Sequence, residues 1–188
     1  LERAVACGRH IPDRPGADRH GRGWAGAAAQ PLTGFSHGAA GIAHALVGLY
    51  EATGQAGFLD AARRGVAFEQ ALFDPARGNW PDLRLDDRPG FPSQWCHGAT
   101  GIGFARLAAL PVMKGATELR ADVDAAITCT LCEADGGRDN LCCGHAGRVS
   151  MLGYAARRLD DRGLATRADA RMAAWLARAG GPAGYCLL

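Results

Sequence analysis

Three cysteines in this sequence have the residue type and the setting of metal ligands. Cys96 lies in the segment WCHG, and Cys142 and Cys143 lie side by side in the segment LCCG. Zinc prefers thiolate ligands, and a catalytic zinc site usually has three protein ligands and one open position. A metal held by three thiolates carries a net negative charge, so a further thiolate bound there is a stronger nucleophile. The expected chemistry is therefore alkylation of a thiol at zinc, not activation of water.

The four remaining cysteines are weaker candidates, namely Cys7, Cys129, Cys132 and Cys186. An isolated cysteine is usually a small buried apolar residue. Cys129 and Cys132 stand three positions apart on an expected helix, so ligation by this pair is an open alternative. The odd total of seven cysteines argues against a disulfide framework, and we expect the thiols to be reduced.

Two histidines stand directly before a Gly-x-x-Gly turn. His37 begins HGAAG, and its placement favours acid/base catalysis, with a structural role as the alternative. His97 follows Cys96, and we expect it either to orient or protonate a substrate or to pack behind the ligand. His145 is a weaker candidate for a fourth ligand.

A compact polar and aromatic segment, NWPDLR at residues 79–84, lies between two expected helices. One interpretation is an ordinary loop that is anchored by Trp80. The other is that Asp82 or Arg84 lines the rim where the active residues are expected to meet, and these two are the candidate substrate-binding residues.

These residues belong to a repeat, which indicates how the chain must position them. The segments GFSHGAAGI (34–42), QWCHGATGI (94–102) and NLCCGHAGR (140–148) each place His or Cys before Gly-x-x-Gly. Each turn is followed by an inner helix, expected over 41–53, 101–110 and 147–159. Each inner helix is followed by a second helix, expected over 57–73, 117–134 and 164–179.

The second helices are amphipathic. In 57–73, apolar residues such as Phe58 and Leu72 are interleaved with polar ones, among them Arg64 and Glu69. Two-helix repeats in series predict an all-α fold, a partial α/α toroid of the six- or seven-hairpin barrel type, built from repeated helical hairpins. If the inner helices are parallel, the Gly-x-x-Gly turns all meet at one rim.

The composition and the N-terminal residues indicate how the chain is organised and which partners it is expected to have. Residues 1–33 are rich in Arg, Gly, Pro and Ala, so we expect an irregular lead-in before a domain of residues 34–188. The net charge of +2, without a basic block, argues against nucleic acid as a partner. No apolar run is long enough to span a bilayer. Because the start lacks Met and a signal pattern, we interpret the chain as a cytoplasmic fragment of a longer protein.

The motifs resemble those of the lanthionine cyclase (LanC-like) family, most closely the C-terminal cyclase domain of class II lanthionine synthetases (LanM). The resemblance is carried by GFSHGAAGIAHAL (34–46), FDPARGNWPDLR (73–84), WCHGATGI (95–102) and LCCGHAGR (141–148). With the helices between them these segments span residues 34–180, and WCHG followed by LCCG is their most specific feature.

The resemblance implies a toroid of helical hairpins, of which this chain would form the C-terminal half. It implies a zinc ion held by Cys96, Cys142 and Cys143, with His37 in acid/base catalysis and His97 where the family often has Tyr or His. The implied reaction adds a peptide Cys thiolate to dehydroalanine or dehydrobutyrine, forming (methyl)lanthionine rings in lantibiotic biosynthesis. The implied partners are a precursor peptide with dehydrated Ser or Thr and the missing N-terminal cyclase or dehydratase portion.

Two other functions stay open on the sequence. One is a LanC-like protein that binds zinc and a thiol such as glutathione without cyclising a peptide. The other is an inactive, truncated remnant with a zinc-stapled core. Cyclisation of a dehydrated peptide distinguishes the cyclase from the thiol-binding protein, and zinc content distinguishes the remnant from a bare helical fold.

Overall fold

The computed structural model describes residues 1–11, 23–24, 30–84, 89–115, 117–134, 137–182 and 184–187. Throughout these ranges the regular secondary structure is helical apart from isolated β-bridges, which confirms the expected all-α class. The helices are α1 (Glu2–His10), α2 (Ala39–Thr53), α3 (Ala56–Gln70), α4 (Ala99–Ala109), α5 (Thr117–Cys132), α6 (His145–Leu159) and α7 (Arg162–Ala179). No helix within the described ranges is both long enough and apolar enough to cross a membrane.

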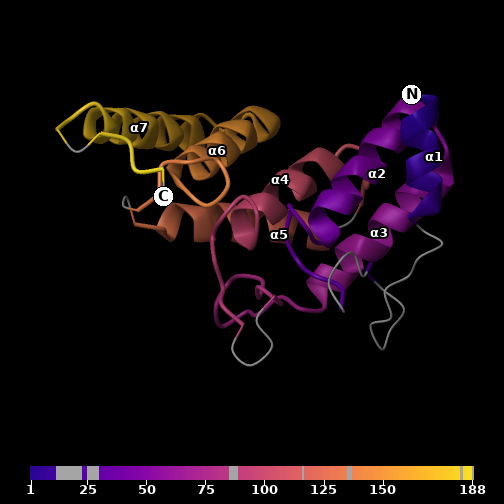
Figure 1. Ribbon diagram of the computed structural model, residues 1–188. Coiled ribbons are helices and arrows are strands. Elements are labelled where there is room, and N and C mark those ends of the chain that lie inside the picture. The colour runs from indigo at the N-terminus through magenta and orange to yellow at the C-terminus, as the bar shows by residue number, and fades with distance from the viewer. Residues whose placement is uncertain are drawn as a thin grey trace.

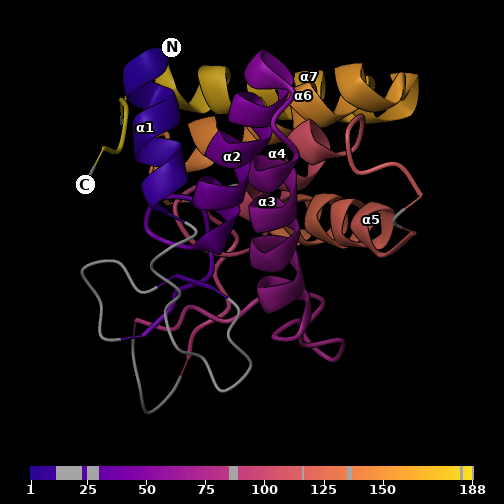
Figure 2. The same cartoon turned by 90° about the vertical axis from the view of Figure 1, so that its right-hand side faces the viewer.

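Helices α2 to α7 form three consecutive hairpins. Helix α2 packs on α3, α4 on α5 and α6 on α7, and the first helix of each pair also packs on the first helix of the next. Figure 1 shows these pairs following one another across the molecule in chain order. In Figure 2 the segments that lead into α2 and α4 lie together at one end of the molecule. This arrangement is consistent with the partial α/α toroid expected from the repeat.

The inner helices begin at residues 39, 99 and 145, slightly before the expected starts at 41, 101 and 147. Their N-caps are Gly38, Gly98 and Gly144, the first glycines of the three Gly-x-x-Gly turns. None of these caps has a side chain that could accept a hydrogen bond from the first helical turn. The expected starts lie two residues too far along the chain, because no Ser, Thr, Asp or Asn stands at these N-cap positions to mark where the helix begins.

The second glycine of each turn is required by the close approach of a carbonyl oxygen. A Cβ atom at Gly41 or Gly101 would lie 1.9 Å from the carbonyl oxygen of Phe35 or Trp95. At Gly147 the corresponding distance to the carbonyl oxygen of Leu141 would be 2.2 Å. Because the same contact recurs, the sequence repeat is also a repeat of backbone geometry.

The irregular lead-in expected over residues 1–33 instead begins with the helix α1. Gly8 explains its position, since a Cβ atom there would lie 2.2 Å from Leu49 of α2 and 3.1 Å from Phe58 of α3. A helix that carries a glycine at this point can approach the first hairpin closely. Residues 12–22 and 25–29 of the lead-in lie outside the described residues, and the domain boundary at residue 34 stays a prediction.

The core continues from the hairpins into the long connection between α3 and α4. Trp80 of this connection is completely buried. It packs with Ala40 at the start of α2 and with Ala99 and Ile102 at the start of α4. Trp80 therefore anchors NWPDLR against the two inner helices whose turns carry His37 and Cys96, and its neighbours Asp82 and Arg84 are held beside those turns.

Candidate functional site

Backbone hydrogen bonds join the three Gly-x-x-Gly turns in a row. The N–H groups of Phe35 and Ser36 donate to the carbonyl oxygen of Cys96, at N···O distances of 3.0 and 3.1 Å. The N–H of Cys96 donates in turn to the carbonyl oxygen of Cys142 at 3.1 Å. The turn with His37 thus lies beside the turn with Cys96, and that turn lies beside the one with the cysteine pair.

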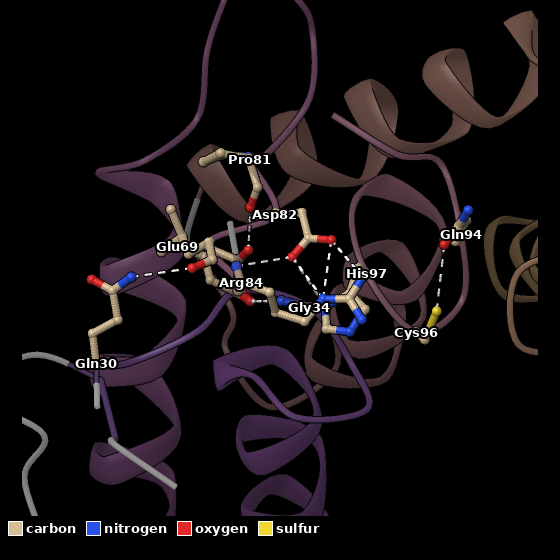
Figure 3. Close-up of polar contacts among 11 residues, drawn as sticks. Gln30, Gly34, Glu69, Pro81, Asp82, Arg84, Gln94, Cys96 and His97 are labelled. Atoms are coloured by element: carbon tan, nitrogen blue, oxygen red, sulfur yellow. Dashed lines mark hydrogen bonds and ion pairs between the residues drawn. The ribbon is translucent and has the colours of Figure 1, made fainter. Parts of the chain in front are cut away.

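The thiols of Cys96 and Cys142 interact directly. Cys96 is buried, and its Sγ lies 3.6 Å from Oε1 of Gln94 (Figure 3). Burial, together with the neighbouring thiols of Cys142 and Cys143, raises the pKa of Cys96 to about 12. A thiol in this setting stays protonated at neutral pH unless a positive charge joins it.

Cys143 lies in the same turn with a separate set of contacts. Its Sγ lies 3.6 Å from Nη1 of Arg138, and its N–H donates to Oδ1 of Asn140 at 2.9 Å. Among the described residues, no group of three or more His, Cys, Asp or Glu side chains is arranged so that it could hold a metal ion. The fold therefore brings the three thiols into neighbouring turns without closing them around one point. Three thiols are a donor set that fits zinc, and the zinc ion itself stays a prediction.

Asp82, Arg84 and His97 form a polar cluster beside Cys96. The carboxylate of Asp82 accepts from Nε of Arg84 at 2.9 Å and from Nη2 at 2.6 Å. Nδ1 of His97 lies 3.9 Å from Oδ1 of Asp82, and Figure 3 shows Asp82 beside both Arg84 and His97. Burial would raise the pKa of Asp82, but the hydrogen bonds from Arg84 outweigh it and the pKa is lowered. This pairing keeps Asp82 ionised and fixes the Arg84 side chain.

His97 is enclosed, with 1% of its surface exposed. Burial, with the nearby charge of Arg84, lowers the pKa of His97. A neutral, enclosed ring fits the alternative in which His97 packs behind Cys96, better than the one in which it protonates a substrate.

His37 is exposed at a groove of about 680 Å³. Arg84 lines the same groove, whereas most of its other lining residues are apolar, among them Phe35 and Ile42. Mostly apolar walls with a few polar groups are typical of ligand-binding sites, in which the apolar walls supply contact area and the polar groups fix the orientation of the ligand.

The guanidinium of Arg84 connects the groove to the thiols. The hydrogen bond to Asp82 is the largest cause that raises the pKa of Arg84, and Cys96 and Cys142 raise it further when their thiols are ionised. Arg84 therefore lies within electrostatic reach of both thiols as well as in the groove. In NWPDLR, Trp80 anchors the loop as one alternative expected, and Arg84 lines the groove, while the binding of a substrate by Asp82 or Arg84 stays a prediction.

Two buried carboxylates that position these turns were not singled out by the sequence. The first, Asp139, accepts from Nε1 of Trp175 at 2.8 Å, from the guanidinium of Arg178 and from the N–H of Cys186 at 2.7 Å. The hydrogen bond from Arg178 is the main cause that lowers the pKa of Asp139 to about 2. Helix α7 and the C-terminal segment thus hold the turn that carries the cysteine pair.

The second carboxylate, Glu69, lies on α3 and is fully buried. Its Oε1 accepts from the N–H groups of Gly34 and Ala40, and its Oε2 accepts from Nη2 of Arg106 at 2.8 Å. The amphipathic pattern of 57–73 identified Glu69 only as one of its polar residues and gave no sign that it is buried. The burial of Glu69 could not be read from α3 alone, because Arg106, the cation that pairs with it, lies on α4.

The sequence is similar to a protein of known biosynthetic context. The Lacticin 481/lactococcin biosynthesis protein LcnDR2 of Lactococcus lactis subsp. lactis is 33% identical over 87 residues. The match covers 46% of this chain and 9% of that protein, so the chain spans a small part of its relative's length. The family described as Lanthionine synthetase C-like protein matches residues 16–185, a range that contains helices α2 to α7 and all three turns. The chain therefore belongs to the Lanthionine synthetase C-like protein family.

Proposed function

We propose that the chain is part of a zinc-dependent lanthionine cyclase of lantibiotic biosynthesis. The observation that carries this proposal is the row of backbone hydrogen bonds from Phe35 and Ser36 to Cys96 and from Cys96 to Cys142. That row gathers a histidine and three thiols from distant parts of the sequence. Family membership and the similarity to a lacticin 481 biosynthesis protein support the proposal.

In this proposal Cys96, Cys142 and Cys143 would hold the metal after their side chains close around it, because the three thiols lie in neighbouring turns but are not arranged around one point in the structure. A zinc ion bound by three thiolates supplies Lewis acidity that lowers the pKa of a peptide thiol and keeps the resulting thiolate nucleophilic. The peptide lies in the groove, where Phe35 and Ile42 contact its apolar side chains. Binding both reacting ends of one peptide in one place makes the addition intramolecular and supplies much of the rate gain.

The addition forms one bond and moves one proton. The peptide sulfur bonds to the β-carbon of a dehydroalanine or dehydrobutyrine, and the π electrons shift toward the α-carbon and its carbonyl oxygen. Arg84, which pairs with Asp82 through Nε and Nη2, donates from Nη1 to that oxygen as negative charge develops on it. His37 then protonates the α-carbon, which replaces the proton lost by the thiol. The product is a lanthionine or methyllanthionine thioether.

The substrate and the setting follow from the same proposal. The partner is a precursor peptide whose Ser or Thr residues have been dehydrated and whose Cys residues are free. The dehydratase and the remaining part of the cyclase ring are proposed to lie in an N-terminal portion of a longer, cytoplasmic synthetase.

The test is cyclisation of a peptide that contains a dehydroalanine and a cysteine, with the purified chain in zinc-buffered solution. Loss of the free thiol is followed by alkylation and mass spectrometry, and bound zinc is measured by metal analysis. We expect Cys142→Ala to lose zinc and activity together, and His37→Gln to keep zinc while its rate falls by at least tenfold. If the wild-type chain binds zinc but does not consume the thiol of the added peptide, the cyclase function is contradicted and a thiol-binding function is favoured.

A further inference from the structure

Glu69 contacts the polypeptide on both sides of His37. Its Oε1 accepts from the N–H of Gly34 at 2.9 Å and from the N–H of Ala40 at 3.0 Å. Gly34 precedes His37 by three positions and Ala40 follows it by three. A single carboxylate oxygen thus fixes both ends of the segment that carries His37, defined here as the His37 loop (residues 34–40).

The His37 loop is also held against the turn of Cys96. Phe35 and Ser36 donate to the Cys96 carbonyl oxygen, and a Cβ atom at Gly34 would lie 2.8 Å from that oxygen. The loop therefore has Glu69 on one side and the Cys96 turn on the other. Between these anchors, the side chain of His37 is exposed at the groove.

The carboxylate is itself held rigidly. Its Oε2 accepts from Nη2 of Arg106 at 2.8 Å, and Nε of Arg106 donates to Asp122 at 2.8 Å. Gln70 donates to the same carboxylate of Asp122 at 3.1 Å. A buried network whose members hold one another in this way has little freedom to move. It links α3, α4 and α5, and Glu69 is the member that reaches the His37 loop.

We propose that Glu69 is a positioning residue, which sets the place of His37 relative to the Cys96 turn by binding both ends of the His37 loop. The inference rests on the proposed function, because it takes His37 as the proton donor. A proton donor must lie within hydrogen-bond reach of the atom that it protonates. A displacement of about 1 Å can reduce the rate on the order of a hundredfold.

The test compares three variants with the wild-type chain. E69M/R106M replaces the Glu69–Arg106 ion pair with apolar side chains, so that neither of these two partners is left without the other, while Asp122 loses Arg106 and keeps the hydrogen bond from Gln70. E69Q keeps an oxygen that can accept from the loop. D122N is the matched control, because Asp122 also pairs with Arg106 but does not contact the loop. The measurements are hydrogen–deuterium exchange of residues 34–40, zinc content, and kcat and KM for cyclisation.

In E69M/R106M we expect faster exchange over 34–40 and a kcat lowered roughly tenfold to a hundredfold, with KM and zinc content close to wild type. E69Q should restore most of the protection and most of kcat. D122N should leave the exchange over 34–40 and kcat within about twofold of wild type, which for kcat corresponds to less than 1 kcal/mol. Unchanged exchange over 34–40, or an equal loss of kcat in D122N, overturns the inference.

One further variant and one further outcome keep the test decisive. If E69M/R106M does not fold, E69D replaces it, because its carboxylate is one methylene shorter and cannot serve both Arg106 and the loop. E69D is then expected to show the same faster exchange. If the wild-type chain binds zinc but does not cyclise the peptide, the proposed function has failed. The exchange data still decide whether Glu69 orders the loop.

Discussion

Arg84 is the residue on which the electrostatics of the groove depend. It lies in the groove, pairs with Asp82 and is close enough to Cys96 and Cys142 for their thiols, when ionised, to raise its pKa. Lysine cannot reproduce this arrangement, since a single ammonium group cannot bind the carboxylate at two points and also reach a substrate oxygen.

We therefore expect Arg84→Lys to lower kcat/KM for cyclisation by about tenfold to a hundredfold, as for loss of one donor to a developing oxyanion. Arg77→Lys is the control, because Arg77 lies over the ring of Phe91 in the same connection and does not line the groove. The kinetics are measured at saturating zinc. Equal effects of the two substitutions would show that Arg84 acts only by stabilising the connection.

Asp139 makes the stability of the turn that carries Cys142 and Cys143 depend on pH. Its pKa is lowered from an ordinary 3.8 to about 2, mainly by Arg178. The fold thus favours the ionised form, so this carboxylate stabilises the protein above pH 4 and loses its effect as the pH falls toward 2.

Asp139→Asn is accordingly expected to be less stable than wild type at pH 7, with a difference that shrinks as the pH falls from about 4 to 2. Urea unfolding over this pH range measures the difference. Asp124→Asn serves for comparison, since Asp124 forms an exposed ion pair with Arg120, and such pairs contribute at most about 1 kcal/mol. A difference for Asp139→Asn that is constant with pH would contradict the assignment.

Among the helices, α2 contains two glycines with opposite roles. A Cβ atom at Gly41 would lie 1.9 Å from the carbonyl oxygen of Phe35, whereas at Gly48 it would meet no atom within 4 Å. Because the first contact is with backbone, it cannot be relieved by rotation of a side chain.

We expect Gly41→Ala to lower the free energy of unfolding by about 1–3 kcal/mol, since it inserts a methyl group into a filled space. Gly48→Ala should raise it by about 0.5–1 kcal/mol through the higher helix propensity of alanine. Denaturant midpoints of both variants test this, with unchanged slopes as the sign that the comparison is valid. A loss of stability in both variants would mean that α2 tolerates no side chain at either position.

Helical periodicity and the repeated turns predicted most of the elements, because both signals are local. The second helices were expected over 57–73, 117–134 and 164–179, and α3, α5 and α7 occupy almost the same ranges. Helix α1 was missed because it is only 9 residues long and the segment 1–33 around it is rich in Arg, Gly and Pro. Val5 packs this helix against the core, and Gly8 allows its close approach to the first hairpin.

The site was predictable only where a motif marked it. The turns of His37, Cys96 and Cys142 were expected to meet and are joined by hydrogen bonds, whereas the zinc ion is still a prediction. Glu69 and Asp139 were missed because each depends on a distant cation, Arg106 or Arg178, that no local pattern can pair with it. The burial of His97 likewise follows from the packing of loops on one another, which periodicity does not describe.

For the molecule as a whole, the proposed metal would link separate hairpins. Cys96 lies before α4 and Cys142 lies before α6, so one ion bound by both would join the second hairpin to the third. In the chain itself these turns share a backbone hydrogen bond between Cys96 and Cys142. A ligand that binds the folded state and not the unfolded one stabilises the fold according to its concentration.

Zinc should therefore raise the free energy of unfolding by about 2.7 kcal/mol when its free concentration is a hundred times the dissociation constant. Cys142→Ala should abolish the increase, because only two thiolates would be left at the site. Cys132→Ala should retain it, since Cys132 is an exposed thiol on α5 and does not belong to any of the three turns. Thermal unfolding at a series of buffered zinc concentrations measures the effect. Equal dependence on zinc in the two variants would mean that the metal binds elsewhere, and the three turns would then be joined by their hydrogen bonds alone.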